Sequence, residues 1–388
     1  MRECDLSQGI RKASQKRFGG DAVVFRAPGR VNLIGEHTDY NGGFVMPAAI
    51  DFSTYVAIGP RSDRKLVIYS EQFGAASVEL DGQRGPATPA WVNYVYGVAA
   101  TLEKQGLRID GANVLVDGGV PVGAGLSSSA ALEVSSCLAF LHIAGEQLDG
   151  VAIARACQQA EHDYAGAHVG IMDQFVSANA KAGHALLLDC RSLQCQHEPL
   201  PAGIKLVVCN TMVKHAIAGG EYNARRRECE EGVRELQKRL PCVSALRDVA
   251  PEQLEQFESE LPTLIYRRCR HVVSEDARVE SAAKALQAGD LQQFGRLMQA
   301  SHESLRQDYE VSCRELDVMV EIANQSLGVY GARMTGGGFG GCTVNLVAED
   351  AVAEFEERVG REYRERTGIA PEIYVCAASA GAQRVDGD

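Results

Sequence analysis

The chain lacks the features that mark a membrane, secreted or zinc-binding protein. No apolar run in its 388 residues approaches the length of a membrane span, and its first residues form no apolar signal core. Twelve cysteines are scattered without a Cys-x-x-Cys pair, and nine histidines form no His-Glu-x-x-His motif. We therefore expect buried free thiols, no zinc site and a cytoplasmic protein.

Basic residues are also scarce. Lysine and arginine number 39 against 51 aspartates and glutamates, which gives a net charge of −12. This balance argues against nucleic acid or an anionic membrane as a partner. Hydrophobic residues make up 45% and charged residues 23%, an ordinary globular composition, and the length suggests two or three domains. We find no internal repeats or low-complexity tracts.

The periodicity of apolar residues predicts helices and strands in mixed order. Helical spacing is found in Trp91–Lys104, and helices are also expected in the strongly apolar run Ala130–Ile143, in Val151–Gly166 and in the charged run Glu221–Arg239. Strand patterns are found in Asp21–Arg26, Gly111–Asp117, Ile204–Asn210 and Cys342–Val347. Because the two kinds of element do not alternate strictly, we predict an α+β fold. Composition changes near Arg191–Ile204, so we expect one lobe in residues 1–195 and another in 196–388.

A first motif, Gly29–Phe44, gathers charged side chains among glycines. It contains Arg30, Glu36, His37 and Asp39. Charged groups are costly to bury unless they are paired. Carboxylates accept hydrogen bonds from hydroxyls and arginine presents a rigid fork of donors, so the pattern favours a site for a polyhydroxylated ligand. A surface loop with a solvated salt bridge is the alternative.

A second motif, Pro121–Ala131, reads Pro-Val-Gly-Ala-Gly-Leu-Ser-Ser-Ser-Ala-Ala between a predicted strand and a predicted helix. Glycines free the turn, serines cap the helix, and unpaired N–H groups at the positive helix end bind phosphate. No Gly-Lys-Ser/Thr follows, so this is not a Walker-type loop, and a serine replaces the third glycine of Gly-x-Gly-x-x-Gly. A capped connection without a ligand is the alternative.

A third motif, Thr335–Thr343, holds five glycines in the six positions 336–341. Ordering so many glycines is entropically expensive, and a plain turn needs only one or two. We therefore expect close backbone packing against another loop or a ligand, with a flexible hairpin as the alternative. A dinucleotide fingerprint is disfavoured because these glycines follow a helix and precede a strand.

These three motifs, in this order, resemble the signatures of the galactokinases within the superfamily of galacto-, homoserine, mevalonate and phosphomevalonate (GHMP) kinases. The segment Gly170–Phe175, Gly-Ile-Met-Asp-Gln-Phe, adds a fourth likeness. The resemblance implies two α+β lobes with the active site between them. It implies a ribosomal-protein-like α/β sandwich for the N-terminal lobe and a ferredoxin-like C-terminal lobe.

The resemblance further implies a reaction in galactose catabolism. The γ-phosphate of ATP would pass to the anomeric hydroxyl of D-galactose, with Mg²⁺ as cofactor, in a monomer or a weak dimer. A kinase for N-acetylgalactosamine or L-arabinose is the nearer alternative. A catalytically silent galactose sensor is the other. Such sensors damage the serine loop, whereas Ser127–Ala131 is intact here.

Site residues follow from the same resemblance. Asp173 is implied as the catalytic base, with Arg30 beside it. Sugar contacts are implied for Glu36, His37, Asp39, Gly170 and Tyr222. ATP contacts are implied for Gly123, Ala124, Gly125, Leu126, Ser127, Ser128, Ser129 and Trp91, and Mg²⁺ contacts for Ser129 and Glu161.

Each assignment has a structural alternative when the residues are taken alone. Asp173 suits a helix N-cap, which aspartate favours. Glu161 suits a solvated helix face, Trp91 a core position, and Tyr222 a contact between domains. The run Arg225–Arg227 faces acidic residues at helical spacings such as Arg226–Glu230, which is typical of a solvated salt-bridge face.

Overall fold

Long antiparallel strands form the framework of the first half of the chain. The computed structural model describes residues 3–81, 85–214 and 218–385. β1 (Val23–Asn32) pairs with β3 (Pro47–Pro60) from Val23 opposite Ile58 to Asn32 opposite Pro47. Among the described residues, six strands join in the order β13-β1-β3-β6-β4-β5. The others are β4 (Lys65–Ser70), β5 (Gly74–Glu79), β6 (Ala112–Gly118) and β13 (Gln383–Arg384).

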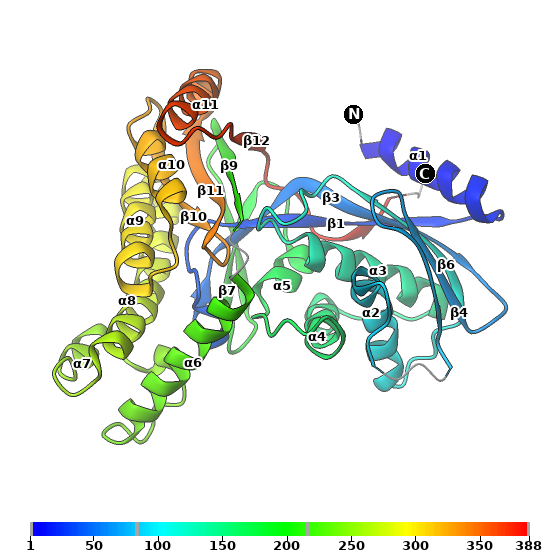
Figure 1. Ribbon diagram of the computed structural model, residues 1–388, viewed down its shortest axis with the longest axis horizontal. Coiled ribbons are helices and arrows are strands. Elements are labelled where there is room, and N and C mark those ends of the chain that lie inside the picture. The colour runs from blue at the N-terminus through cyan, green and yellow to red at the C-terminus, as the bar shows by residue number, and fades with distance from the viewer. Residues whose placement is uncertain (1–2, 82–84, 215–217, 386–388) are drawn as a thin grey trace.

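Helices cover both faces of this sheet (Figure 1). On one face lie α2 (Asn93–Lys104), α3 (Ser128–Ala144), α4 (Gly150–Ala160) and α5 (Met172–Asn179), and on the other α1 (Glu3–Phe18). Successive side chains of a strand point to opposite faces. Phe25 and Val56 accordingly join the core beneath α2–α4, whereas Val24 and Tyr55 pack with α1.

The second half is built on a second antiparallel sheet. Its order is β10-β11-β9-β12, where the strands are β9 (Ile204–Lys214), β10 (Val329–Thr335), β11 (Gly340–Ala348) and β12 (Glu372–Cys376). Helices α6 (Ala218–Gln237), α7 (Pro251–Glu255), α8 (Thr263–Gln287), α9 (Leu291–Ser304) and α10 (Arg314–Asn324) follow β9, and α11 (Val352–Thr367) follows β11. This is a β-α-β-β-α-β arrangement, and the α+β class and the ferredoxin-like lobe are confirmed.

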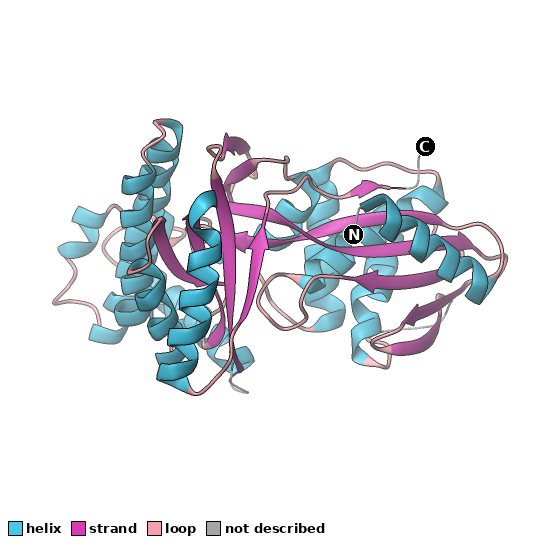
Figure 2. Ribbon diagram, turned by 90° about the horizontal axis from the view of Figure 1, so that it is seen from above, coloured by secondary structure: helices cyan, strands magenta, loops and turns pink. Residues whose placement is uncertain are grey.

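A small sheet joins the two parts. It has the order β2-β7-β8, from β2 (Phe44–Val45), β7 (His184–Asp189) and β8 (Cys195–Pro199). Figure 2 shows that the strands of the two large sheets run in crossing directions. The boundary expected between residues 195 and 196 would fall inside β8. β13 also returns to pair with β1, so the chain crosses between the lobes more than once.

Several elements differ from the sequence predictions. The strand predicted for Asp21–Arg26 continues to Asn32, so Arg30 lies on a strand and not in a loop. The helix predicted for Val151–Gly166 changes at Glu161 into a π-helical turn. The pattern analysis did not predict α1, β5, β8 or β10.

The structure also bears on the predictions about cysteines and membrane spans. Every cysteine whose side chain the structure describes is a free thiol, and most are buried. Across residues 3–81, 85–214 and 218–385, none of the helices is long and apolar enough to cross a membrane.

Candidate active site

The centre of the site is an ion pair between β1 and α5. Arg30 donates from Nε to Asp173 Oδ1 and from Nη2 to Oδ2, each at 2.7 Å. Both side chains are largely buried, which strengthens a charge-assisted bidentate pair. Asp173 is not a helix N-cap: Ile171 occupies that position of α5, and no side chain caps the helix. The carboxylate therefore plays no part in capping α5.

The serine-rich loop is fastened to this pair. Arg30 Nη1 donates to the carbonyl of Gly125 at 2.6 Å, and Ser127 Oγ donates to Asp173 Oδ2. Gly29 makes the close approach possible, since a Cβ there would lie 2.6 Å from the carbonyl oxygen of Leu126. The side chains of Ala124 and Leu126 are buried in the core, so only their backbone can contact a ligand.

The third motif packs against both earlier motifs. A Cβ on Gly336 would lie 3.4 Å from the carbonyl oxygen of Gly125, and one on Gly341 would lie 3.6 Å from that of Ala124. The backbone N–H of Gly336 donates to Glu36 Oε1 at 2.7 Å. The expected close packing of this segment is therefore confirmed. The segment is also the turn of a hairpin, since β10 and β11 pair antiparallel with Thr335 opposite Cys342.

Glu36 is held in a buried position by the opposite lobe. Arg333, wholly buried on β10, lies 3.6 Å from Glu36 Oε1. Burial raises the pKa of Glu36, while the positive charges of Arg333 and Arg30 oppose that rise. The backbone carbonyl of Glu36 also bonds to His271 at 3.1 Å. Sequence reasoning did not single out Arg333 or His271, because neither lies in a motif.

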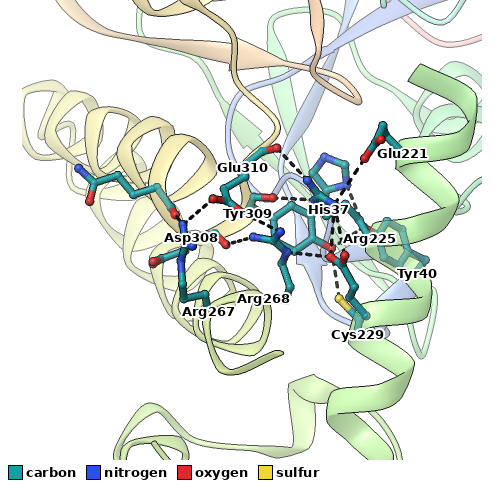
Figure 3. Close-up of polar contacts among 12 residues, drawn as sticks. His37, Tyr40, Glu221, Arg225, Cys229, Arg267, Arg268, Asp308, Tyr309 and Glu310 are labelled. Carbon is teal, nitrogen blue, oxygen red and sulfur yellow. Dashed lines mark hydrogen bonds and ion pairs between the residues drawn. The ribbon is translucent and has the colours of Figure 1, made fainter. Parts of the chain in front are cut away.

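His37 belongs to a chain of buried polar groups (Figure 3). His37 Nδ1 shares a hydrogen bond of 2.8 Å with the Tyr40 hydroxyl, which lies 2.7 Å from the hydroxyl of Tyr309. Tyr309 in turn contacts Cys229 Sγ at 3.2 Å. Burial lowers the pKa of His37 to about 3, so the imidazole is neutral and can both donate and accept.

Asp39 and Gly170 approach each other closely. A Cβ on Gly170 would lie 1.6 Å from Asp39 Oδ2, so only glycine fits there. Burial, together with the nearby charge of Asp173, raises the pKa of Asp39 to about 7. Asp39 therefore titrates close to neutral pH.

A cavity of about 510 Å³ brings these groups together. It is lined by residues of both lobes, among them Arg30, Glu36, His37, Asp39, Gly170, Asp173, Tyr222, Gly336 and Gly337. All five residues that the resemblance implied for sugar contact therefore line this cavity. Tyr222 reaches it from the first turn of α6, and its hydroxyl has a pKa raised well above the usual value by burial.

Tyr222 depends on an anchor that the sequence did not reveal. Arg225, one turn further along α6, is buried and donates to the carbonyls of Tyr309 and Glu310 at 2.7 and 2.9 Å (Figure 3). The expectation of a solvated face is wrong for Arg225. It is confirmed for Arg226, which pairs with Glu230 at 3.2 Å.

Glu161 lies behind the serine loop. It is 5% exposed, so the solvated-face alternative is wrong. Its carboxylate is hydrogen-bonded by the Ser129 hydroxyl and by Gln174 Nε2, the latter at 2.6 Å. Burial and the charge of Asp173 raise the pKa of Glu161 to about 7. The hydroxyl and the carboxylate that were implied as metal ligands are therefore neighbours.

A second cavity, of about 420 Å³, adjoins the loop. Gly123, Ser128 and Ser129 line it together with Trp91 and Phe73. The two aromatic rings stack with centroids 5.6 Å apart. Trp91 packs on the core and also lines this cavity, so the core interpretation is confirmed and the contact with ATP stays a prediction. Phe73 gave no signal in the sequence, since it stands in a weakly patterned segment.

Comparison with known proteins places this arrangement in a class. Models of the GHMP kinases N terminal domain and the GHMP kinases C terminal match residues 93–181 and 282–365. The mevalonate kinase of Methanococcus jannaschii has a TM-score of 0.66 at 18% identity, covering 93% of this chain and 99% of its own, a likeness of fold alone. The fold and the glycine-rich loops thus define a GHMP kinase.

More similar proteins narrow the assignment. The galactokinase galactose-binding signature matches residues 14–60. Curated galactokinases of Chloroflexus aurantiacus and Chloroflexus aggregans are 48% and 47% identical, covering 96% and 97% of both chains. A crystal structure of Lactococcus lactis galactokinase complexed with galactose has a TM-score of 0.94 at 36% identity, covering 98% of this chain and 100% of that one. The chain belongs to the galactokinase family.

Proposed function

We propose that this protein transfers the γ-phosphate of ATP to the anomeric hydroxyl of D-galactose, giving α-D-galactose 1-phosphate and ADP. One observation carries the proposal: the Arg30–Asp173 pair contacts the serine loop through Gly125 and Ser127 while it lines the larger cavity. A group able to accept a hydroxyl proton thus stands where an acceptor sugar and a phosphate would meet. Phosphoryl transfer depends chiefly on such positioning.

The sugar is proposed to occupy the larger cavity. The buried carboxylate of Glu36, the partly exposed carboxylate of Asp39 and the neutral ring of His37 offer acceptors and donors for hydroxyls. Gly170 allows close approach, and Tyr222 closes the cavity from the other lobe. That a relative of 36% identity was crystallised with galactose supports this sugar.

Asp173 is proposed to accept the proton of the anomeric hydroxyl. Arg30 orients the carboxylate through two hydrogen bonds and neutralises charge that develops as the phosphoryl group moves. Backbone N–H groups of residues 123–129, at the N-terminus of α3, orient the phosphates. Trp91 and Phe73 offer flat apolar faces for the base of ATP in the smaller cavity.

The residues present fit a divalent cation. Mg²⁺ takes oxygen ligands, usually one or two carboxylates together with substrate phosphates. The adjacent oxygens of Ser129 and Glu161 meet that requirement beside the phosphate-binding loop. When bound, Mg²⁺ would neutralise phosphate charge.

A coupled ADP-release assay over a small sugar panel tests the proposal. The panel is D-galactose, N-acetylgalactosamine, L-arabinose and D-glucose, with product phosphorylation sites read by NMR. Turnover of galactose at its anomeric position supports the proposal. Preferred turnover of N-acetylgalactosamine or L-arabinose would reassign the substrate, and galactose binding without ADP release would indicate a sensor.

Three further expectations remain part of this proposal. They are a cytoplasmic location, a monomer or weak dimer, and a division between the lobes near residue 195. Size-exclusion chromatography with light scattering tests the second, and limited proteolysis tests the third.

A further inference from the structure

A fully buried amide stands next to the proposed base. Gln174, which follows Asp173 on α5, has no exposed surface. Its Nε2 donates to Glu161 Oε2 at 2.6 Å and to Glu133 Oε2 at 3.0 Å. One amide nitrogen therefore bridges two carboxylates, one from α3 and one from the turn after α4.

This bridge fixes the orientation of the amide. An amide nitrogen carries two protons, and each is directed here to a carboxylate oxygen. The amide oxygen makes no hydrogen bond with either carboxyl group, nor with any other residue that the structure describes. Glu133 thus sets the direction of Gln174, and Gln174 sets the position of the Glu161 carboxylate.

Stability does not explain the arrangement. Glu133 Oε1 and Gln174 Oε1 are buried and have no hydrogen-bond partner among the residues that the structure describes. Unpaired buried polar atoms destabilise a fold, and apolar side chains of similar volume are often more favourable than buried charges. A polar group retained at such a cost points to a role in function.

Glu161 is also held from a second side. Ser129 hydrogen-bonds the same carboxylate, and Ser129 and Glu133 stand one turn apart on α3. The carboxylate is thus fixed between α3 and α5, the helices that carry the serine loop and Asp173. Its place relative to the phosphates and the base therefore depends on Gln174.

We propose that Gln174 is a positioning residue that holds Glu161 in place for the divalent cation, with Glu133 holding Gln174. The inference rests on the proposed function, because it takes Glu161 as a metal ligand. Groups that orient metal ligands commonly change metal affinity by about 10- to 100-fold when they are removed.

The test is Mn²⁺ binding to the full chain with a non-hydrolysable ATP analogue, measured by electron paramagnetic resonance. Gln174→Met keeps the length of the side chain and removes both donors. We expect its Mn²⁺ dissociation constant to rise by about tenfold or more, with galactose affinity by calorimetry unchanged. The matched control is Gln287→Met, which removes a similar amide bond of 2.8 Å to Glu198 in the other lobe.

A second variant guards against misfolding. Glu133→Met keeps the length of the side chain and removes the oxygen that accepts from Gln174, and we expect weaker Mn²⁺ binding there too. A variant that melts at a lower temperature but binds Mn²⁺ like the wild type would overturn the inference. If the wild type itself neither binds Mn²⁺ with nucleotide nor phosphorylates galactose, the proposed function fails instead.

Discussion

Arg30 and Asp173 stand 143 residues apart in the chain and meet through two parallel hydrogen bonds of 2.7 Å. The pair joins β1 to the first turn of α5. Its third contact, from Arg30 to the carbonyl of Gly125, ties it to the serine loop. The proposed base and the proposed phosphate-binding loop are thereby held together by direct hydrogen bonds.

The first prediction concerns Asp173 as the base. Asp173→Asn keeps the size of the side chain and removes the proton acceptor, so turnover should fall by roughly 10²–10⁴-fold. The protein should still fold, because Asp173 does not cap α5, but its melting temperature should fall because Arg30 loses a charged partner. Galactose binding should persist through Glu36 and Asp39.

Steady-state kinetics and thermal melts check this. Asp149→Asn is the matched control: Asp149 caps α4 through the Ala152 N–H, and asparagine caps about equally well. Activity of Asp173→Asn close to that of the wild type would show that Asp173 is not the base.

The second prediction concerns metal dependence. Glu161→Gln should raise the Mg²⁺ concentration for half-maximal activity by about tenfold or more, since a carboxylate ligand is lost. The KM for galactose should change much less. The control is Asp163→Asn in the same π-helical turn, where Asp163 faces outward and binds Lys104 at 3.0 Å. If the two variants need the same Mg²⁺ concentration for half-maximal activity, Glu161 is not a metal ligand.

The third prediction concerns the close approach of Gly170 to Asp39. Gly170→Ala would place a methyl group on the Asp39 carboxylate and displace it. Galactose affinity should fall by about tenfold or more, which corresponds to the loss of about 1.4 kcal/mol of binding free energy. Gly360→Ala, where a helical glycine has open space around it, should leave affinity unchanged. Calorimetric titration with galactose distinguishes the two, and unaltered binding in Gly170→Ala would contradict the geometry.

The fourth prediction concerns pH and stability. Asp276 accepts from the Phe44 N–H at 2.7 Å, and burial raises its pKa to about 7. Between the unfolded pKa of about 3.8 and the folded value, the native state binds more protons, so stability falls as pH rises through that window. Asp276→Asn keeps the acceptor and cannot ionise.

Denaturant unfolding at pH 4 and at pH 8 therefore isolates this group. At pH 4 the free energy of unfolding of the variant should match that of the wild type. At pH 8 it should exceed the wild-type value by at most about 4 kcal/mol, which is the free energy equivalent of the pKa shift. If the difference in unfolding free energy between variant and wild type is the same at pH 4 and at pH 8, Asp276 does not titrate as stated.

Local patterns predicted much of the fold. The sequence located α2, α3 and α6 to within a few residues, from an apolar stripe, a strongly apolar run and a long charged run respectively. The glycine clusters likewise marked the loops that need close backbone approach. The strand β10 was not predicted, because its burial comes from the helices that cover it and its sequence has no alternation of apolar and polar residues.

Position on a helix face was less predictable than the helix itself. Arg225 and Arg226 are neighbours in a charged run, yet one is buried against backbone carbonyls and the other is paired at the surface. The sequence does not distinguish these two arginines, because both lie in the same charged run. Only the packing of α6 against the turn at Tyr309 separates them.

By itself the sequence determined the chemical inventory: Arg30, Glu36, His37 and Asp39 in one segment, the serine loop, and the motif order that revealed the family. Spacing, turn chemistry and periodicity are local properties, so a single chain displays them. The tertiary structure alone decided which of these groups meet. Bonds between residues far apart in sequence, such as Arg30 to Asp173 or Gly336 to Glu36, depend on how the sheets and helices pack, and no local pattern encodes that packing.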